Sequence, residues 1–382
     1  MKSEHIYLSL AHIGGRELDF IQEAFDTNWV VPLGPNVDAF EQSLSDYIGE
    51  GRFVVALSSG TAAIHLGLIQ LGVQTGDEVI CQSFTFAASA NPVVYLGAIP
   101  VFVDSEPDTW NMNAVLLEDA IKDRLKKTGK LPKAIVTVHL YGMPAKMKEI
   151  NKIAVKYEIP VIEDAAEALG STLNGKKCGS FGEFGILSFN GNKIITTSGG
   201  GALVCRTEEQ TKRTKFYATQ ARDPAPHYQH SHIGYNYRMS NICAGIGRGQ
   251  MLVLDDHIAR RREIHRLYSD LLKDVQGITV MQSPDTMYDT NYWLTCILVD
   301  PTIYGMTRED LRVRMEVNDI ETRPLWKPMH LQPVFADVPA YIDGTSERLF
   351  DRGLCLPSGS NLTNEDIQRV VDVLINSMGA TW

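Results

Sequence analysis

The chain has 382 residues, of which 44% are hydrophobic and 21% are charged, so it is long enough to bury more than one hydrophobic core. It holds 36 basic and 46 acidic residues, and the formal net charge of -10 argues against broad binding to nucleic acid or to an anionic membrane surface. No run of about 18 apolar residues predicts a membrane span, and the first residues lack the pattern of a signal peptide. We therefore expect neither nucleic acid nor membrane as a partner, and a cytoplasmic location.

The first two thirds of the sequence alternates short β-rich runs with helical patterns, which is typical of an α/β fold with a mainly parallel sheet. "FVVAL" at 53–57 predicts a buried strand, and a polar turn then leads into a helical pattern with Ile64, Leu68 and Leu71 on it. Further strands are predicted in "DEVICQ", "AIPVFVD", "KAIVTVHL", "IPVIED", "GEFGILSFN" and "GGGALVC". Several reactive side chains follow the ends of these strands, where open α/β sheets bind ligands.

The character of the sequence changes near residue 244. The segment 244–275 predicts one long amphipathic helix, followed by the strand-like "NYWLTCILVD", the segment "RPLWKPMH" and a last helix from Asn364. We predict a large α/β domain at 1–245 and a smaller α+β domain at 246–382, joined through the long helix.

A lone lysine, Lys193, lies in the loop "SFNGNKIITTSGGG" between two predicted strands. These strands are apolar enough to be central in the sheet, which would place the loop in a cleft. A desolvated amine is more easily neutral and is then a nucleophile toward carbonyl groups. Pyridoxal phosphate is the commonest partner for such an amine in an α/β protein, and the glycines at 199–201 would let backbone pass close to its ring. The alternative is a solvated surface cation.

A site for pyridoxal phosphate also needs residues that bind its pyridine nitrogen and its phosphate. Asp164 ends the strand "IPVIED" and could keep the pyridine nitrogen protonated, although it could equally cap a helix. Ser59, Gly60 and Thr61 begin a helix after a strand and could offer N–H groups to the phosphate, or form a plain helix cap.

Two further side chains fit the same cofactor. Ser188 could add a hydroxyl to the phosphate site, and Phe86 could stack on the ring. Core packing is the alternative for both Phe84 and Phe86, and we favour it for Phe84.

Metal binding is not expected. The six cysteines are far apart and form no CxxC pair, a spacing that favours small core residues over a disulfide framework. The segment "HYQHSH" holds His227, His230 and His232, but their spacing matches no common zinc site.

Taken together, these motifs resemble the DegT/StrS-type nucleotide-sugar aminotransferases, which share the aspartate aminotransferase-like fold, the type I fold of pyridoxal phosphate-dependent transferases. The resemblance covers nearly the whole chain and rests on "SSGTAAIHL", "SFTFAAS", "IEDAAEALG", "SFNGNK", "GYNYRMS" and "RPLWKPMHLQPVF". It is closest to the C4 aminotransferases of UDP-N-acetylbacillosamine biosynthesis, through "NWVVPLGPNVDAFE", "YATQAR" and "ETRPLWKPMH".

The resemblance implies roles for individual residues. Lys193 would bind pyridoxal phosphate covalently, with Asp164 at the pyridine nitrogen and Phe86 over the ring. Gly60, Thr61 and Ser188 would hold the phosphate, and Asn236 would reach the phosphate of the other subunit in a homodimer. Glu167 stands near the cofactor hydroxyl where many members have glutamine or histidine, and its role is left open.

The implied substrates are a UDP-linked 4-keto-6-deoxy sugar, aminated at C4, and L-glutamate as the amino donor. The diphosphate needs local cations, which "ETRPLWKPMH" supplies as Arg323, Lys327 and His330 around Trp326, with Arg238 as a further candidate. A solvated basic loop is the alternative. By the resemblance, Asn28 and Trp29 would contact the sugar.

Other functions stay open at this point. Another nucleotide keto-sugar could be the substrate, such as a GDP-linked 4-keto mannose, giving GDP-perosamine, or a 3-keto sugar. A non-catalytic binding domain with the same fold is a more distant alternative. Related sugar dehydratases use pyridoxamine phosphate and lack the lysine, so Lys193 argues against that class.

Overall fold

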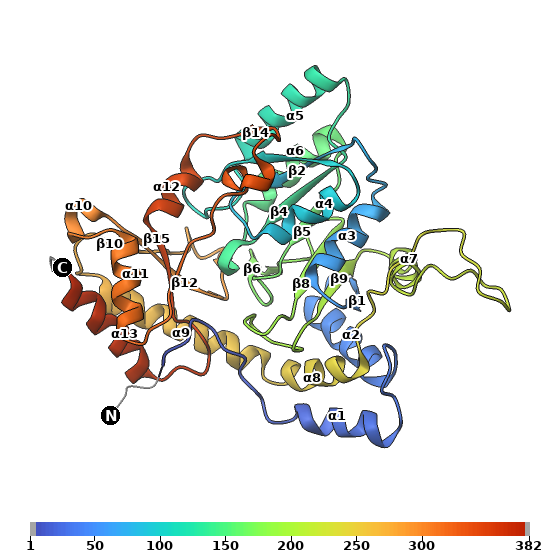
Figure 1. Ribbon diagram of the computed structural model, residues 1–382, viewed down its shortest axis with the longest axis horizontal. Helices are drawn as coiled ribbons and strands as arrows, with labels where there is room; N and C mark the ends of the chain where they lie inside the picture. The colour runs from blue at the N-terminus through green and yellow to red at the C-terminus, as the bar shows by residue number, and fades with distance from the viewer. Residues whose placement is uncertain (1–4, 379–382) are drawn as a thin grey trace.

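The computed structural model describes residues 5–378, and its largest feature is an eight-stranded sheet with helices packed against it (Figure 1). Neighbouring strands are parallel except where β9 pairs with β1 and with β8. The strands lie in the order β1 (Phe53–Leu57), β9 (Gly201–Cys205), β8 (Phe184–Ser188), β5 (Val161–Asp164), β4 (Ala134–Val138), β2 (Glu78–Gln82), β3 (Ile99–Val103) and β14 (Ala340–Tyr341).

These strands form where the sequence has short, almost wholly apolar runs. Both faces of the sheet are covered, so nearly every residue of β1, β4 and β9 is buried, as in other parallel sheets. Two hydrophobic clusters pack on the sheet, one including Ile64 and Leu68 of the helix after β1, the other Leu117 and Ile150. All the strands predicted before residue 206 are confirmed.

Eight α-helices accompany the large sheet in the described residues 5–251. One of them, α3 (Gly60–Gln70), matters for the site, and its N-cap is Ser59. The others are α1 (Glu17–Asp26), α2 (Pro35–Ile48), α4 (Asn91–Tyr95), α5 (Ala114–Thr128), α6 (Met147–Tyr157), α7 (Glu208–Ala218) and α8 (Asn241–Met251). A three-stranded sheet of β11 (Tyr288–Asp289), β6 (Thr172–Leu173) and β7 (Lys176–Lys177) lies apart from the large one.

A second, antiparallel sheet has its own hydrophobic core in the C-terminal part of the chain. It consists of β10 (Ile278–Val280), β12 (Thr295–Val299), β15 (Gly353–Leu356) and β13 (Arg323–Pro324), with the helices α9 (Leu254–Leu272), α10 (Pro301–Tyr304), α11 (Arg308–Val317), α12 (Thr345–Arg352) and α13 (Asn364–Ser377). The last helix begins at the predicted residue.

The single long helix predicted over 244–275 is wrong, because the chain forms α8 and α9 with a break between them. Leu252 and Val253 donate backbone hydrogen bonds to residues three positions back, and Val253 has φ -120° and ψ 8°, which ends the α-helical geometry.

The predicted division into domains at 245/246 stays a prediction, and its outermost residues, 1–4 and 379–382, lie outside the described part. Three pairings join the parts: β14 lies beside β3 in the large sheet, β11 pairs with β6, and Ile6 pairs with Ile320. Within residues 5–378, no helix is long and apolar enough to cross a membrane.

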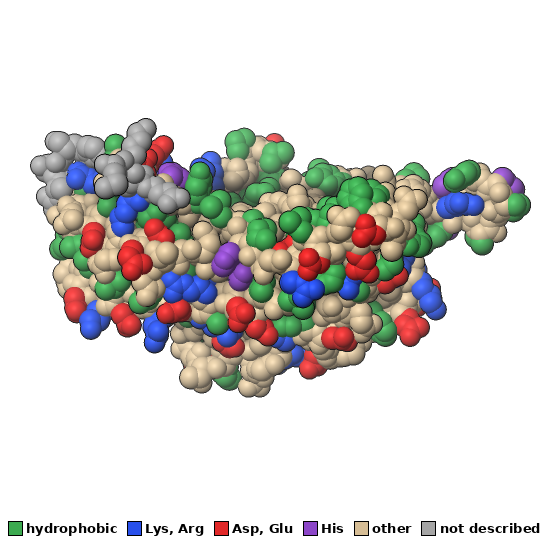
Figure 2. All heavy atoms as spheres, turned by 90° about the horizontal axis from the view of Figure 1, so that it is seen from below, with side chains coloured by type: hydrophobic (Ala, Val, Ile, Leu, Met, Phe, Trp, Pro, Cys, Tyr) green, Lys and Arg blue, Asp and Glu red, His purple; other side chains and the backbone are tan. Residues whose placement is uncertain are grey.

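The segment between α7 and α8 projects from the body of the molecule (Figure 1). Figure 2 shows it at the right-hand end, with hydrophobic and histidine side chains on its surface. Tyr228 is 80% exposed and Ile233 is 83% exposed, although side chains of this kind are usually buried. Over the described residues, no group of three or more His, Cys, Asp or Glu side chains is placed to hold a metal ion.

Candidate active site

A cavity of about 310 Å³ lies where β5 and β8 end and α3 begins. It brings together every residue predicted to bind the cofactor except Asn236. These residues are Ser59, Gly60, Thr61, Phe86, Asp164, Glu167, Ser188 and Lys193. Residues more than a hundred positions apart therefore meet at one end of the sheet, as the position of ligand sites in open α/β sheets predicts.

Lys193 lies in the loop between β8 and β9, and its side chain is only 13% exposed. The Nζ atom lies 3.6 Å from Glu167 Oε1 and 3.9 Å from the centroid of the Trp293 ring. The Nε1–H of Trp293 donates a 2.7 Å hydrogen bond to the carbonyl oxygen of Asn192, the residue before the lysine. The lysine is thus held inside the cavity, and the reading of Lys193 as a solvated surface cation is wrong.

Asp164 is the last residue of β5 and is 6% exposed. Its Oδ2 accepts a 2.6 Å hydrogen bond from the hydroxyl of Ser89, and its Oδ1 accepts one of 3.2 Å from the backbone of Ala166. The residues directly after Asp164 form turns and no helix, so the alternative role as a helix cap does not apply.

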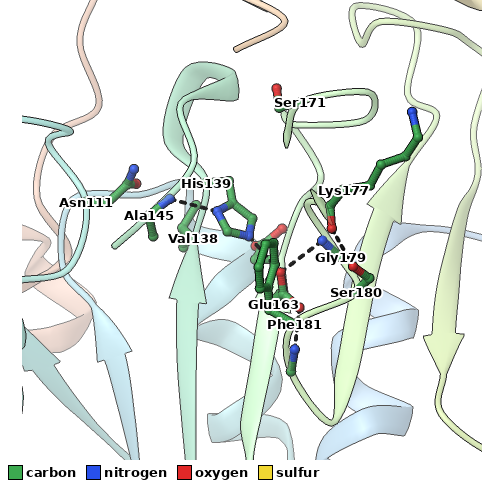
Figure 3. A network of polar contacts seen from close by, with 12 residues as sticks. Asn111, Val138, His139, Ala145, Glu163, Ser171, Lys177, Gly179, Ser180 and Phe181 are labelled. Atoms are coloured by element: carbon green, nitrogen blue, oxygen red, sulfur yellow. Dashed lines mark hydrogen bonds and ion pairs between the residues drawn. The ribbon is translucent and has the colours of Figure 1, made fainter. Parts of the chain in front are cut away.

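A buried polar network holds the end of β5 from the other face of the sheet (Figure 3). The backbone N–H of Ala145 donates to Nδ1 of His139, which leaves Nε2–H to donate to Glu163 at 2.9 Å. The Glu163 carboxylate also accepts from Gly179, and the backbone of His139 donates to the carbonyl oxygen of Asp164. These contacts fix the backbone that carries Asp164 into the cavity.

The start of α3 and the end of β8 form the part of the cavity suited to an anion. The Ser59 hydroxyl accepts a 3.0 Å hydrogen bond from Ala62, so this side chain is the helix cap, which was its alternative reading. The first N–H groups of a helix have no partner within it and favour a negative charge. Gly201 passes so close that a Cβ on it would lie 2.3 Å from the nitrogen of Gly60, so a side chain there would displace the helix start.

Aromatic side chains form one wall. Phe86, which is 53% exposed, lies with its ring 5.3 Å from that of Trp326. Tyr141 stacks between Trp293 and Trp326, at 6.4 and 6.3 Å. Phe84 is fully buried in the core, as predicted.

A second cavity of about 510 Å³ adjoins the first and shares Asn192, Trp293 and Trp326 with it. Arg323 and Lys327 contribute its cationic side chains, and the rest of its lining includes Tyr141, Phe350, Leu8 and Glu321. The two cavities together offer an amine at one end and cations at the other.

Arg238, predicted as a further cation for the diphosphate, lies outside both cavities, and its role stays a prediction. Its guanidinium is 8% exposed, forms a close ion pair with Glu41 and donates to the carbonyl oxygen of Ala56 at 2.9 Å. It lines neither cavity, because these contacts hold it beside α2.

Four other predicted residues also lie outside both cavities. His330 contacts the hydroxyl of Ser83 at 2.6 Å and Glu347 at 3.1 Å. Asn28 and Trp29 follow α1. Asn236 accepts a hydrogen bond from Gln220 within the projecting segment.

The sequence analysis missed Tyr141, Trp293 and Asn192. Tyr141 follows β4 closely, so the rule that ligand sites lie at strand ends could have found it. Its φ of 54° is the left-handed region that a bulky residue rarely adopts. Nothing in the sequence placed Trp293 beside the lysine loop.

The chemistry of the first cavity fits pyridoxal phosphate. It offers a primary amine, a buried carboxylate, a helix N-terminus and an aromatic face around one enclosed space. Burial raises the pKa of the Glu167 carboxyl, while the Lys193 ammonium and the N–H of Tyr141 act in the opposite direction.

Comparison with known proteins gives a consistent result. The model of the DegT/DnrJ/EryC1/StrS aminotransferase family matches residues 11–375. The chain is 50% identical over 375 residues to EpsN of Bacillus subtilis, a putative pyridoxal phosphate-dependent aminotransferase, covering 97% of this chain and 95% of EpsN. It is 36% identical over 369 residues to the GDP-perosamine synthase of Caulobacter vibrioides, covering 97% of each. A crystal structure of a DegT DnrJ EryC1 StrS aminotransferase from Brucella abortus superimposes with a TM-score of 0.87 at 30% identity over 96% of each chain.

Proposed function

Because the chain belongs to the DegT/DnrJ/EryC1/StrS family of pyridoxal phosphate-dependent aminotransferases, we propose that it moves an amino group from L-glutamate to C4 of a nucleotide-linked keto-sugar. The specific acceptor proposed is a UDP-linked 4-keto-6-deoxy-N-acetyl amino sugar, which gives a UDP-4-amino-4,6-dideoxy sugar of the UDP-N-acetylbacillosamine type. The observation that carries the proposal is the junction of the two cavities, with Lys193 in one and Arg323 and Lys327 in the other.

Each residue of the first cavity has one task in this proposal. Lys193 would hold the cofactor, and its amine is placed in the cavity to accept and donate a proton. Asp164 keeps the ring nitrogen protonated, and a charged hydrogen bond of this kind contributes about 1.5–3 kcal/mol. Gly60, Thr61 and Ser188 hold the phosphate, with Ser59 capping their helix. When bound, the cofactor supplies a ring that withdraws electrons from the donor carbon.

The second cavity suits the nucleoside diphosphate. A chain with a net charge of -10 has to place cations locally to bind two phosphates, and Arg323 and Lys327 do so beside the aromatic rings of Trp326 and Tyr141. Arg323 now pairs with Glu321 at 2.8 Å and is 68% exposed, so it is free to exchange this partner for a phosphate. The contacts predicted for His330, Asn28 and Trp29 stay predictions.

We also propose a homodimer as the active unit. Asn236 lies outside the cavity of its own chain, and the projecting segment before it exposes Tyr228 and Ile233. A second copy that covered this segment would bury apolar surface and could receive Asn236 at its cofactor phosphate. The cytoplasmic location stays a prediction.

A GDP-linked 4-keto sugar is the second candidate acceptor. The observation that favours it is the identity of 36% to a GDP-perosamine synthase over nearly the full length of both chains.

One assay separates these acceptors. The holoenzyme is incubated with L-glutamate and, in separate reactions, a UDP-linked 4-keto-6-deoxy-N-acetyl sugar, a GDP-linked 4-keto-6-deoxy sugar and a nucleotide-linked 3-keto sugar. Mass spectrometry and NMR then identify any new amine and its carbon. We expect an amine at C4 of the UDP-sugar, and none with Lys193→Ala. Faster amination of the GDP-sugar would replace the proposed acceptor, and no aminated sugar at all would contradict the proposed function.

A further inference from the structure

Glu167 is a buried carboxylate that faces the reactive lysine and that the reaction described above does not use. It is 5% exposed, and its Oε1 lies 3.6 Å from Nζ of Lys193. Among the described residues, it is the one carboxylate within 4.0 Å of that nitrogen. A carboxylate this deep in a protein needs a partner to offset its desolvation, and here the partner is the lysine itself.

The backbone holds the Glu167 carboxylate in place. Its second oxygen, Oε2, accepts a 2.7 Å hydrogen bond from the N–H of Tyr141. Tyr141 adopts φ 54°, and its hydroxyl accepts a 2.8 Å hydrogen bond from the backbone of Trp326, which fixes the loop from both ends. Apart from Lys193, no described residue donates a hydrogen bond to Oε1, so the oxygen that faces the lysine is the one able to take a proton.

Burial and the neighbouring charges raise the proton affinity of the Glu167 carboxylate. Burial and the nearby Asp164 carboxylate raise the pKa of Glu167, whereas Lys193 and the Tyr141 N–H lower it, and the net direction is upward. The thiol of Cys296 lies close enough to be affected by the charge of Glu167. A carboxyl whose pKa moves toward neutrality exchanges protons more readily with an amine, because the two protonation states become closer in energy.

We propose that Glu167 takes the proton that the Lys193 ammonium must lose before its nitrogen can bond to the cofactor aldehyde, and then gives that proton back. In this step Lys193 passes one proton to Oε1, and its neutral nitrogen bonds to the aldehyde carbon. As the C=N bond forms, the carbon–oxygen bond breaks and the oxygen leaves as water with two hydrogens. Glu167 returns to its carboxylate form, one hydrogen stays on the nitrogen, and no electrons are gained or lost. The inference rests on the proposed role of Lys193.

The test follows bond formation rather than turnover. Full-length protein freed of its cofactor is mixed with pyridoxal phosphate in a stopped-flow instrument, and the visible band is recorded over a range of pH around neutrality. We expect Glu167→Gln to slow the appearance of the band by at least about tenfold, since positioned acid–base groups contribute about 10²–10⁴-fold to rates. Glu106→Gln is the matched control, because Glu106 is a 6% exposed carboxylate paired with Lys146 at 2.8 Å and lines neither cavity. It is expected to react at the wild-type rate.

A rescue experiment separates proton transfer from a purely structural role. Glu167→Ala leaves room for a small carboxylic acid, so added formate is expected to restore the rate in proportion to its concentration, whereas chloride at equal ionic strength is not. A wild-type rate in Glu167→Gln, or a slow Glu167→Ala that formate does not accelerate, would overturn the proposal. If Glu167→Gln does not fold, Glu167→Asp is subjected to the same measurement, with a partial rate expected.

The proposed function is tested separately in the same samples. Borohydride reduction followed by peptide mapping shows which residue carries the cofactor. Attachment elsewhere than Lys193 would refute the proposed function whatever the rate, while attachment at Lys193 with an unchanged rate would refute the role of Glu167 alone.

Discussion

The Nζ atom of Lys193 lies 3.9 Å from the centroid of the Trp293 ring, and the indole N–H of Trp293 donates to the carbonyl oxygen of the residue before that lysine. One side chain from the second half of the chain thus contacts both the charge and the backbone of the lysine loop. A cation over an aromatic face gains about 0.5–2 kcal/mol, and a hydrogen bond about 0.5–1.5 kcal/mol.

Trp293→Leu removes both contacts, so we expect the Kd for pyridoxal phosphate to rise by about fivefold or more, in line with the sum of about 1–3.5 kcal/mol for the two interactions. Trp293→Phe keeps an aromatic face and loses only the hydrogen bond, and its effect is expected to be smaller. Cofactor affinity is measured by titration of the visible band. Equal Kd values for the wild type and Trp293→Leu would show that the ring does not support the lysine.

Asp164→Asn tests the carboxylate at the end of β5. The amide keeps the shape of the side chain but cannot stabilise a proton on the cofactor ring, and the loss of about 1.5–3 kcal/mol predicts a turnover lower by about 10- to 100-fold. Binding of the cofactor is expected to persist. The half-reaction with L-glutamate is followed by absorbance in single turnover, with Asp289→Asn, which is 54% exposed in its side chain, as the control. Unchanged half-reaction kinetics would contradict the assignment.

Arg323→Met and Lys327→Met test the second cavity. If these cations bind the diphosphate, the KM for the nucleotide sugar rises by about tenfold or more for each, since a hydrogen bond to a charged group contributes about 1.5–3 kcal/mol. The half-reaction with L-glutamate, which needs no nucleotide, is expected to keep its rate. Arg312→Met lies outside both cavities and serves as the control. A slower donor half-reaction instead would mean that these cations bind the amino donor.

Asn236 offers a test of the homodimer through mixed subunits. Asn236→Asp places a negative charge where the proposed dimer has a phosphate, and is expected to be nearly inactive, as is Lys193→Ala. In a mixed dimer, one site combines the intact Lys193 of one subunit with the intact Asn236 of the other. Random pairing makes about half of the dimers mixed, and each mixed dimer has one active site out of two. Co-refolding or co-expression of the two inactive variants is therefore expected to recover about a quarter of wild-type activity. No recovery would place Asn236 at its own chain's site, whereas an active Asn236→Asp variant would remove Asn236 from the site.

The main parts of the fold and the cofactor site follow from the sequence for a physical reason. Strands buried on both faces require unbroken apolar runs, so β1 and β9 are visible in the sequence as "FVVAL" and "GALVC". Because parallel strands end at one edge, the side chains that follow them meet there, and Asp164 and Ser188 could be placed together before any coordinates.

Contacts between distant segments could not be predicted in this way. Arg238 has the charge of a phosphate ligand, but Glu41 of α2 pairs with it, and pairing across nearly two hundred residues leaves no local pattern. The break between α8 and α9 falls at Leu252 and Val253, with neither proline nor glycine at the point of interruption, so the amphipathic pattern continues through it. Trp293 reaches the lysine loop only because the chain folds back onto the large sheet.

His265 gives a prediction for stability against pH. It is 4% exposed, its Nε2–H donates to the carbonyl oxygen of Met281 at 2.8 Å, and its ring stacks on Tyr292 with 3.5 Å between centroids. Burial lowers the pKa of His265 to about 4, from about 6.5 in an unfolded chain. Between these values the unfolded state binds more protons than the folded state, so the free energy of unfolding decreases as the pH falls from about 6.5 to about 4.

The size of this effect follows from the pKa difference. The difference between a pKa of about 4 in the folded chain and about 6.5 in the unfolded chain corresponds to about 3 kcal/mol of unfolding free energy, present in full above about pH 6.5 and lost as the pH falls to about 4. We expect the free energy of unfolding of His265→Gln, from urea titrations at a series of pH values, to depend less on pH over this interval by about that amount. His227→Gln, at an exposed histidine of the projecting segment, is the control for the loss of an imidazole. A histidine that burial keeps neutral must contribute to the pH dependence of the unfolding free energy once the unfolded chain can protonate it. If His265→Gln showed the same pH dependence as the wild type, groups other than His265 would therefore account for it.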